Sequence, residues 1–166
     1  GSEIDFYRQG SVDTAASTWD SVVAFNRDGN THYADGTFDG GEAWARTVVW
    51  HEIGHNFDTR EEVGAILPGR EGLIDSFRSL SGWTQTRPSD SWNYKLSGDG
   101  QWWHHRNAAF ALSDEYGAFN PFEDWATAYE SFFQIVAGDP TDLPVPINDK
   151  LYHVAALMHF LQQYAS

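Results

Sequence analysis

Cysteine is absent from this sequence of 166 residues. Its absence excludes disulfide bonds and thiolate metal sites, so histidine and carboxylate side chains are the strong ligands that remain for a transition metal. Basic residues are also scarce, since 10 Lys and Arg stand against 24 Asp and Glu and give a formal charge of -14. Such a charge repels phosphate backbones and anionic lipids, and we therefore expect neither nucleic acid nor a membrane as a partner.

Long apolar runs are missing as well. The sequence contains no stretch of about 18 apolar residues and no basic segment followed by an apolar one, which predicts neither a membrane span nor a signal peptide. We interpret Gly1 and Ser2 as the remainder of a tag and expect the chain to be a piece of a longer protein. Dense acidic charge without a free thiol suits an exported bacterial domain, so we expect a secreted protein.

The chain has enough apolar sequence for one domain with its own core. Hydrophobic residues make up 41% of it and aromatic residues 16%, which is sufficient at this length. A β-prone run, SVVAFN (21–26), comes before turn-rich sequence, and a segment rich in Gly, Ser and Trp (81–107) is interpreted as an irregular or hairpin-like insertion. Helices are predicted from Asp39 through Phe57, near 71–80, from Asn120 to Gly138, and over 148–164.

The stretch VVWHEIGHNFD (48–58) places two histidines four residues apart, with a glutamate directly after the first. On a helix, His51 and His55 leave the same face about 6 Å apart and can converge on one ion. Glu52, about 100° around the helix, is badly angled as a third ligand but can hold a water molecule beside the ion. A zinc ion lowers the pKa of such a water from about 15.7 towards 7, and the carboxylate can then take its proton during attack on a carbonyl. This chemistry is what the H-E-x-x-H motif indicates.

A purely structural role for these three side chains is the main alternative. The predicted helix is apolar on almost every side, so we expect it to run through the interior. Burying three ionisable side chains within five residues costs several kcal/mol unless a strong partner is present. A metal ion would be such a partner, and we therefore favour the zinc interpretation. The apolar residues of the helix are Trp44, Val48, Val49, Trp50, Ile53 and Phe57.

Several side chains near the motif could supply a third ligand. The metzincin pattern would need Gly at position 58 and His at 61, where this chain has Asp58 and Glu61, so that class is excluded. Asp58 lies at the expected helix end, where an acid more often caps the helix or braces a histidine. Glu61 and Glu62 are interpreted as solvated residues of a charged turn. His104 and His105 follow two tryptophans and could line a cleft.

Glu123 is the remaining candidate, and two interpretations of it stand side by side. It can be the third ligand, or it can form a capping-box-like pair with Asn120, three residues earlier, at the start of a helix. The local pattern supports both interpretations equally.

The blocks HEIGHNFD (51–58) and YGAFNPFEDWATAYESF (116–132) together resemble a family of zinc peptidases. That family includes the catalytic domain of anthrax lethal factor and the secreted Pro-Pro endopeptidases. The first block is similar to its His-Glu-φ-Gly-His-x-φ-Asp pattern, and the second to its Tyr-Gly, Asn and Glu-x-x-Ala spacing. The resemblance implies Glu123 as the third ligand of one Zn²⁺ ion and Tyr116 as the phenol that stabilises the oxyanion. The two blocks cover about 25 of the 166 residues.

The chain departs from the family pattern in two respects. Where the family usually has an acid four residues after the ligand, this chain has Thr127, and Glu130 on the same helical face is the candidate for that supporting role. The Trp-rich insertion also makes the gap between the two blocks longer than is usual. Substrate preference is therefore not transferred from the family.

We predict a zincin-like α+β catalytic domain over residues 1–166, with a small, mostly antiparallel sheet packed on the metal-bearing helix and additional helices. The expected function is that of a zinc endopeptidase acting on a polypeptide, with a monomer as the default state. Its predicted metal ligands are His51, His55 and Glu123, with Glu52 as general base and Tyr116 as oxyanion stabiliser.

Two other functions remain open. One is a zinc hydrolase that acts on glycoprotein or mucin-type substrates, and the other is a non-catalytic binding module with a Trp-rich face and a metal site. A substrate strand could pair with the SVVAFN strand at a sheet edge. The tryptophans of the insertion either line the cleft or pack the insertion itself. They are Trp83, Trp92, Trp102 and Trp103.

Overall fold

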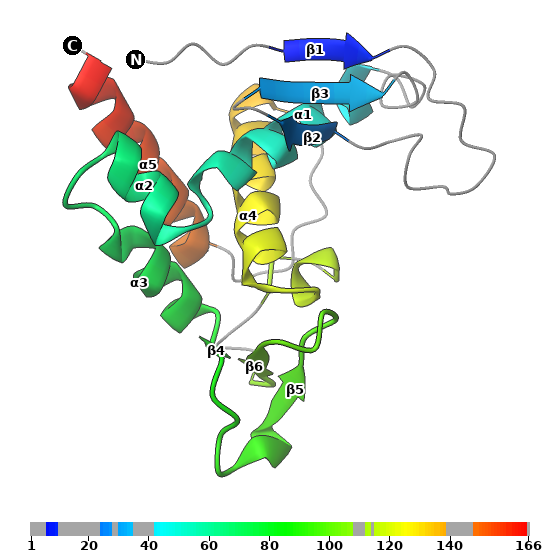
Figure 1. The fold of residues 1–166 in the computed structure, drawn as a ribbon, viewed down its shortest axis with the longest axis vertical. Helices are drawn as coiled ribbons and strands as arrows, with labels where there is room; N and C mark the ends of the chain where they lie inside the picture. The colour runs from blue at the N-terminus through cyan, green and yellow to red at the C-terminus, as the bar shows by residue number, and fades with distance from the viewer. Residues whose placement is uncertain are drawn as a thin grey trace. The chain divides into compact units, whose positions relative to one another are not determined.

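The computed structural model has an α+β architecture, as the sequence predicts (Figure 1). The chain divides into two units, Gly1–Ile53 and Gly54–Ser166, each of which is described by itself. None of the helices in the described part of the chain is long and apolar enough to cross a bilayer. The structure describes residues 6–9, 24–27, 30–34, 42–107, 112–113, 115–138 and 148–165.

The first unit contains a three-stranded sheet and a helix. The strands β1 (Phe6–Gln9), β2 (Ala24–Arg27) and β3 (Asn30–Ala34) lie in the order β1-β3-β2. β2 pairs with β3 in the antiparallel sense, whereas β1 runs parallel to β3, so this sheet is mixed. β2 is an edge strand and covers the end of the predicted 21–26 run, whose first three residues lie outside the described part. Helix α1 (Glu42–Gly54) follows, and its predicted start at Asp39 also lies outside the described residues.

The second unit combines helices with a separate small sheet. The insertion predicted over 81–107 forms this sheet, which is antiparallel throughout and has the order β4-β6-β5. Because each strand is only two or three residues long, the sheet depends on side-chain contacts for its stability. The elements are α2 (Arg60–Ile66), α3 (Gly72–Leu80), β4 (Trp83–Thr84), β5 (Tyr94–Leu96), β6 (Trp103–His105), α4 (Pro121–Ala137) and α5 (Asn148–Ala165).

Helix α4 begins and ends where the sequence predicts. The Asn120 side-chain oxygen accepts hydrogen bonds from the backbone N–H groups of Phe122 and Glu123, both at 2.9 Å, and Pro121 occupies the first turn. Gly138 ends the helix at φ 76°, a left-handed conformation that glycine adopts without the steric cost of a Cβ atom.

Helix α2 is a feature that the sequence analysis missed, because its residues were assigned to a charged turn. The Thr59 side chain accepts from the Glu62 backbone N–H, and the Glu62 carboxylate accepts from the Thr59 N–H at 3.1 Å. This reciprocal pair is a capping box, and Thr59-x-x-Glu62 in the sequence was the signal for it. Glu61 is exposed, as expected, but Glu62 is half-buried.

The core of the second unit surrounds α4. This helix packs against α5, and α3 contacts both α5 and β4. The Phe77 ring meets the Trp125 ring edge-on, with 5.0 Å between the centroids, a favourable geometry for an aromatic pair. Fully buried apolar side chains of this core are Val63, Ile74, Phe77, Trp125, Val154 and Leu157.

Candidate metal centre

The two motif histidines lie one turn apart in a continuous helical run. Helix α1 ends at Gly54 and passes directly into a 3-10 helix, His55–Phe57. His51 and His55 are both half-buried. The boundary between the two units follows Ile53 and therefore falls inside this run, so the spacing of the two rings follows from the local helix.

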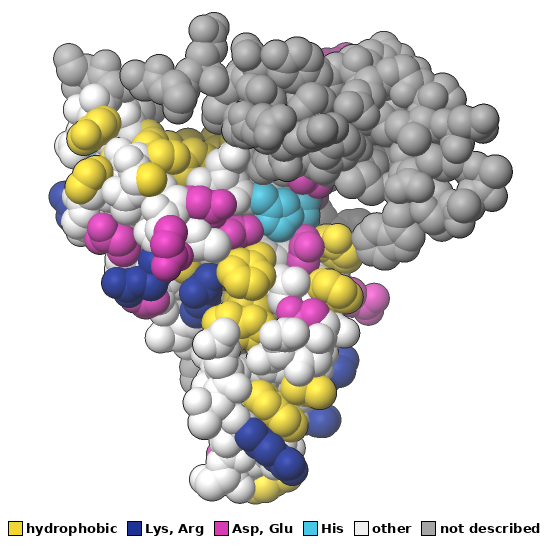
Figure 2. Space-filling view, in the orientation of Figure 1, with side chains coloured by type: hydrophobic (Ala, Val, Ile, Leu, Met, Phe, Trp, Pro, Cys, Tyr) yellow, Lys and Arg dark blue, Asp and Glu magenta, His cyan; other side chains and the backbone are white. Residues whose placement is uncertain are grey.

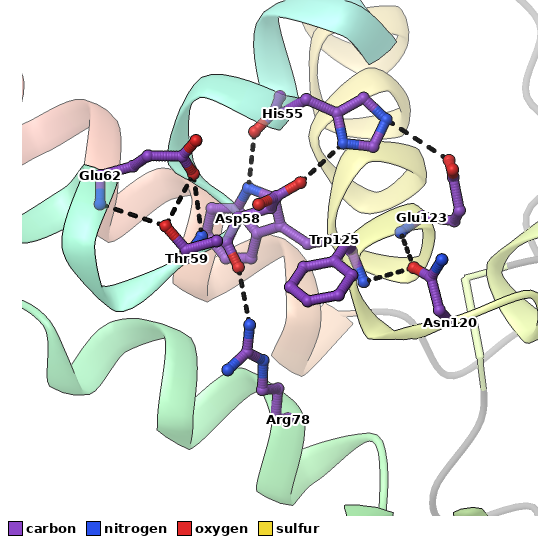
Figure 3. Close-up of polar contacts among 10 residues, drawn as sticks. His55, Asp58, Thr59, Glu62, Arg78, Asn120, Glu123 and Trp125 are labelled. Atoms are coloured by element: carbon purple, nitrogen blue, oxygen red, sulfur yellow. Dashed lines mark hydrogen bonds and ion pairs between the residues drawn. The ribbon is translucent and has the colours of Figure 1, made fainter. Parts of the chain in front are cut away.

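Gly54, between the two histidines, is where the end of this run meets α4. A Cβ atom at Gly54 would lie 3.0 Å from the Ala126 Cα and 3.0 Å from the Tyr129 Cβ, which is too close for most real contacts. The Trp125 indole N–H also donates to the Gly54 carbonyl oxygen at 3.1 Å (Figure 3). The absence of a side chain at Gly54 therefore allows the close approach that brings the beginning of α4 near His55.

Glu123 faces His55 from the first turn of α4. Its Oε2 atom lies 3.4 Å from the His55 Nε2 atom (Figure 3). Asn120 caps the helix through its own side chain, which accepts from the Glu123 backbone N–H. The capping interaction and the contact of Glu123 with His55 thus use different atoms, and the cap orients the residue that contacts the imidazole.

Asp58 braces the other side of the His55 ring, one of the two roles that the sequence analysis considered for it. The Asp58 Oδ2 atom lies 2.7 Å from the His55 Nδ1 atom, and Asp58 itself is buried. Because an ionised carboxylate only accepts hydrogen bonds, the short contact assigns the proton to Nδ1. The other ring nitrogen, Nε2, is then directed towards Glu123. A carboxylate placed like Asp58, on the ring nitrogen that does not bind the metal, commonly orients a metal-binding histidine.

The surroundings of His55 favour a positive charge. Burial alone would lower the pKa of this imidazole, but the hydrogen bonds and negative charges of Asp58 and Glu123 outweigh it and raise the pKa to about 10. Figure 2 shows acidic side chains gathered beside histidine atoms on one face of the molecule. The position between the two acids is therefore suited to a cation, whether a proton or a metal ion.

One pair of the donor atoms has the separation that a shared zinc ion requires. His51, His55 and Glu123 each offer one ligand atom, and the three atoms all lie within 4.8 Å of one another. A tetrahedral ion that holds two ligands at about 2.1 Å separates them by about 3.4 Å. The 3.4 Å between His55 Nε2 and Glu123 Oε2 matches this value. Two imidazoles and a carboxylate are also the ligand types of three-ligand zinc sites.

The histidines of the insertion lie elsewhere. His104 is buried against the Trp83 ring at 5.0 Å, and burial lowers the pKa of His104. His105 packs on the Tyr94 ring at 4.7 Å, and its Nδ1 accepts from the Asn107 N–H at 3.0 Å. Among the described residues, neither histidine belongs to a group of three potential metal ligands.

Glu52 and Tyr116 keep their assigned roles as predictions. Glu52 is half-buried on α1, next to His51. Tyr116 opens a 3-10 helix, Tyr116–Ala118, shortly before α4, and the residue is 43% exposed. A phenol at this place lies on the surface and within the same chain segment as Glu123.

The question of which residue supports Glu123 also stays a prediction. Thr127 is buried, and its hydroxyl has no hydrogen-bond partner among the described residues. Glu130 is half-buried and accepts a hydrogen bond from the Gln134 side chain at 3.3 Å.

The acid next to Glu123 forms a buried network that the sequence analysis missed. Both carboxylate oxygens of Asp124 accept from the Lys150 ammonium group, at 2.7 and 2.8 Å. The Trp83 indole N–H and the Ser113 backbone N–H donate to the same carboxylate, at 2.9 and 2.7 Å. Because these partners are 11 to 41 residues away in the sequence, no local pattern indicates them. The network ties α4 to α5, to β4 and to the segment before α4.

The four tryptophans of the insertion have different environments. Trp83 is buried and hydrogen-bonded to Asp124, and Trp102 is half-buried with its ring edge-on to Phe122 at 6.1 Å. Both of these tryptophans therefore contact α4. Trp103 lies 5.5 Å from the Arg87 guanidinium carbon, and Trp92 is 78% exposed.

Comparison with known protein families, with curated proteins and with solved structures gives no match to this chain. The resemblance to zinc peptidases and the zincin-like form of the α+β fold therefore stay predictions, as does a single catalytic domain over residues 1–166.

Proposed function

We propose that this protein is a zinc-dependent endopeptidase that holds one ion through His51, His55 and Glu123. The observation that carries the proposal is the convergence of three ligand atoms within 4.8 Å, with one imidazole braced by a buried carboxylate. Three protein ligands leave the fourth position of a tetrahedral ion open, which is typical of catalytic zinc sites.

The chain's own residues provide the acid-base chemistry of peptide hydrolysis. When bound, a zinc ion acts as a Lewis acid that polarises the substrate carbonyl and acidifies water. Glu52 takes a proton from the attacking water, whose oxygen bonds to the carbonyl carbon, and then donates the proton to the amine that leaves when the C–N bond breaks. Tyr116 donates a hydrogen bond to the oxyanion, a contribution of about 10²-fold or more in rate at comparable sites. Asp58 keeps the proton of His55 on Nδ1, so that Nε2 has its lone pair available.

Metal analysis combined with digestion of a peptide library tests this function. We expect one zinc per chain in the wild type, loss of zinc in His55→Ala, and retained zinc with peptide cleavage reduced by at least about 10²-fold in Glu52→Gln. Full cleavage by Glu52→Gln would remove the assigned role of Glu52. Failure of the wild type to take up zinc at neutral pH would overturn the proposal.

Hydrolysis of glycosylated protein is a second candidate, favoured by the exposure of Trp92. An exposed indole offers an apolar face against which a sugar ring can stack. The test is to compare cleavage of a glycopeptide with cleavage of the same peptide without its glycan, using wild type and Trp92→Ala. A preference for the glycopeptide that Trp92→Ala abolishes would favour this candidate.

A purely structural metal site in a binding module is less well supported, since structural zinc sites usually have four protein ligands.

A further inference from the structure

Arg78 of α3 reaches the residue that braces His55. Its Nη2 atom donates to the main-chain oxygen of Asp58 at 2.9 Å, across 20 residues of sequence (Figure 3). Asp58 is where the 3-10 helix of His55 ends, so the hydrogen bond fixes the main chain at the end of the motif. A hydrogen bond from a charged donor is stronger than one between neutral groups.

The same guanidinium group also contacts the beginning of α4. Its central carbon lies 5.2 Å from the centroid of the Phe122 ring and 5.3 Å from that of Trp102. Phe122 directly precedes Glu123, and Trp102 belongs to the insertion. Arginine is suited to such a position because its planar cation stacks on aromatic rings while its N–H groups donate in the plane.

The residue before Arg78 anchors α3 to α4. Phe77 packs edge-on against Trp125 of α4, and the Trp125 indole donates to the Gly54 carbonyl. Arg78 therefore contacts both the end of the motif and the first turn of α4, whereas Phe77 contacts α4 alone and reaches the motif only through Trp125. Burial lowers the pKa of Arg78, and the negative charges of Asp58 and Glu61 act against this effect.

We propose that Arg78 is a positioning residue of the metal centre. It holds Asp58 in place, and Asp58 in turn fixes the position of the His55 ring relative to Glu123. The inference rests on the proposed function, because His55 and Glu123 must keep a fixed relative position to bind one ion. Without Arg78 the end of the motif loses its link to Phe122, and the His55 ring loses the fixed orientation of its Asp58 partner. Partners that orient a metal ligand typically contribute 10- to 100-fold in affinity, and we expect about tenfold for this one.

The test uses two Arg78 variants and two controls. Arg78→Met removes the hydrogen bond and the charge but keeps an apolar stem, whereas Arg78→Lys keeps a charged donor. Arg60→Met removes an equal charge from an exposed ion pair with Asp75. Ile74→Val, at a buried position of α3, lowers stability without touching a polar contact.

Two properties of the folded protein are measured. The first is the NMR signal of the His55 Nδ1 proton in the metal-free protein, identified by its loss in His55→Gln. The second is zinc affinity, from competition with a chelator. We expect Arg78→Met to shift the proton signal or speed its exchange and to weaken zinc binding about tenfold, and Arg78→Lys to recover part of both losses. Both controls should match the wild type.

Contrary outcomes separate the two proposals. A wild-type proton signal and zinc affinity in a folded Arg78→Met would overturn the positioning role, and so would an equal loss in Ile74→Val, which would assign the effect to stability. If Arg78→Met does not fold, Arg78→Gln decides, because it removes the charge and the planar stacking, and wild-type values of both properties there would overturn the role. If the wild type binds no zinc, the proposed function fails, whereas the proton signal still decides whether Arg78 orients His55.

Discussion

The first turn of α4 carries two consecutive acids whose surroundings differ completely. Asp124 is fully buried, and its carboxylate accepts hydrogen bonds from Lys150, Trp83 and Ser113. Glu123 is half-buried, and its carboxylate lies beside the His55 imidazole, 3.4 Å away. Only the rotation of α4 decides which acid faces the interior and which faces the histidines.

The comparison shows what distinguishes a structural acid from a candidate ligand. A buried carboxylate surrounded by fixed donors is stable because its charge is compensated, and losing one donor is costly. Where a carboxylate and an imidazole share a proton, a metal ion can take the place of that proton. We therefore expect changes at Asp124 to affect stability and changes at Glu123 to affect metal binding.

Removing the cation of the buried network should have the largest effect. Lys150→Met leaves the Asp124 charge buried without its ion-pair partner, so we expect the free energy of unfolding to fall by about 3–5 kcal/mol in urea titrations. Adding Asp124→Asn should recover part of the loss because it removes the uncompensated charge. A change below about 1 kcal/mol in Lys150→Met would contradict the structural role of this pair.

Glu123→Gln tests the other acid of the turn. The amide keeps the shape of the side chain but loses its charge, so we expect zinc affinity to fall more than about 100-fold, or about 2.7 kcal/mol. The stability of the metal-free protein should fall less than in Lys150→Met, because the buried Asp58 still pairs with His55. Glu115→Gln, at an exposed acid before α4, serves as the control and should bind zinc like the wild type. Unchanged zinc affinity in Glu123→Gln would eliminate Glu123 as a ligand.

Gly54→Ala tests the close approach that brings the two segments together. The added methyl group would press on Ala126 and Tyr129, and overpacking of this kind costs about 1–3 kcal/mol. We also expect weaker zinc binding, because α4 must move away from His55. The matched control is Gly64→Ala in α2, where the three atoms nearest to the added Cβ all belong to the Glu71 side chain, which can move aside. Thermal unfolding should show the control to be neutral or slightly stabilised, and equal losses in both variants would contradict the explanation.

The pH dependence of the metal-free protein tests whether His55 carries a positive charge between the two acids. The pKa of His55 is raised from 6.5 to about 10 in the folded protein. Its contribution to stability is therefore fully present below pH 6.5 and is lost as pH rises towards 10, by at most about 1.4 kcal/mol per pH unit. Urea titrations between pH 6.5 and 9 should show this slope in the wild type. The slope should be absent in His55→Gln, and an equal slope there would contradict its assignment to His55.

Predictions that depend on neighbouring residues agree with the structure at both ends of α4, but the sequence interpreted as turn-rich after SVVAFN contains the strand β3 (Asn30–Ala34). The start and end of α4 follow from Asn120, Pro121 and Gly138, since caps act within one turn. The spacing of His51 and His55 follows from the same local geometry. The capping box of Thr59 and Glu62 shows that α2 was also predictable, although a run of charged residues was mistaken for a turn.

Contacts between distant segments were not predictable in this way. Lys150 is buried on α5, although a lysine is ordinarily expected at the surface, because its partner Asp124 lies 26 residues earlier in the chain. The role of Arg78 depends on a hydrogen bond to Asp58 and on two aromatic rings from different elements. No periodicity or spacing in the sequence connects these residues.

The sequence by itself determined the helices and caps that carry the candidate ligands, because these depend on interactions within a few residues. It left Glu123 with two interpretations, as a metal ligand or as the partner of Asn120 in a capping box, which the local pattern supported equally. The tertiary structure decided that Glu123 faces His55 while Asp124 is buried. The physical reason is that the rotation and approach of α4 are set by contacts such as that of Trp125 with Gly54, which join segments 71 residues apart.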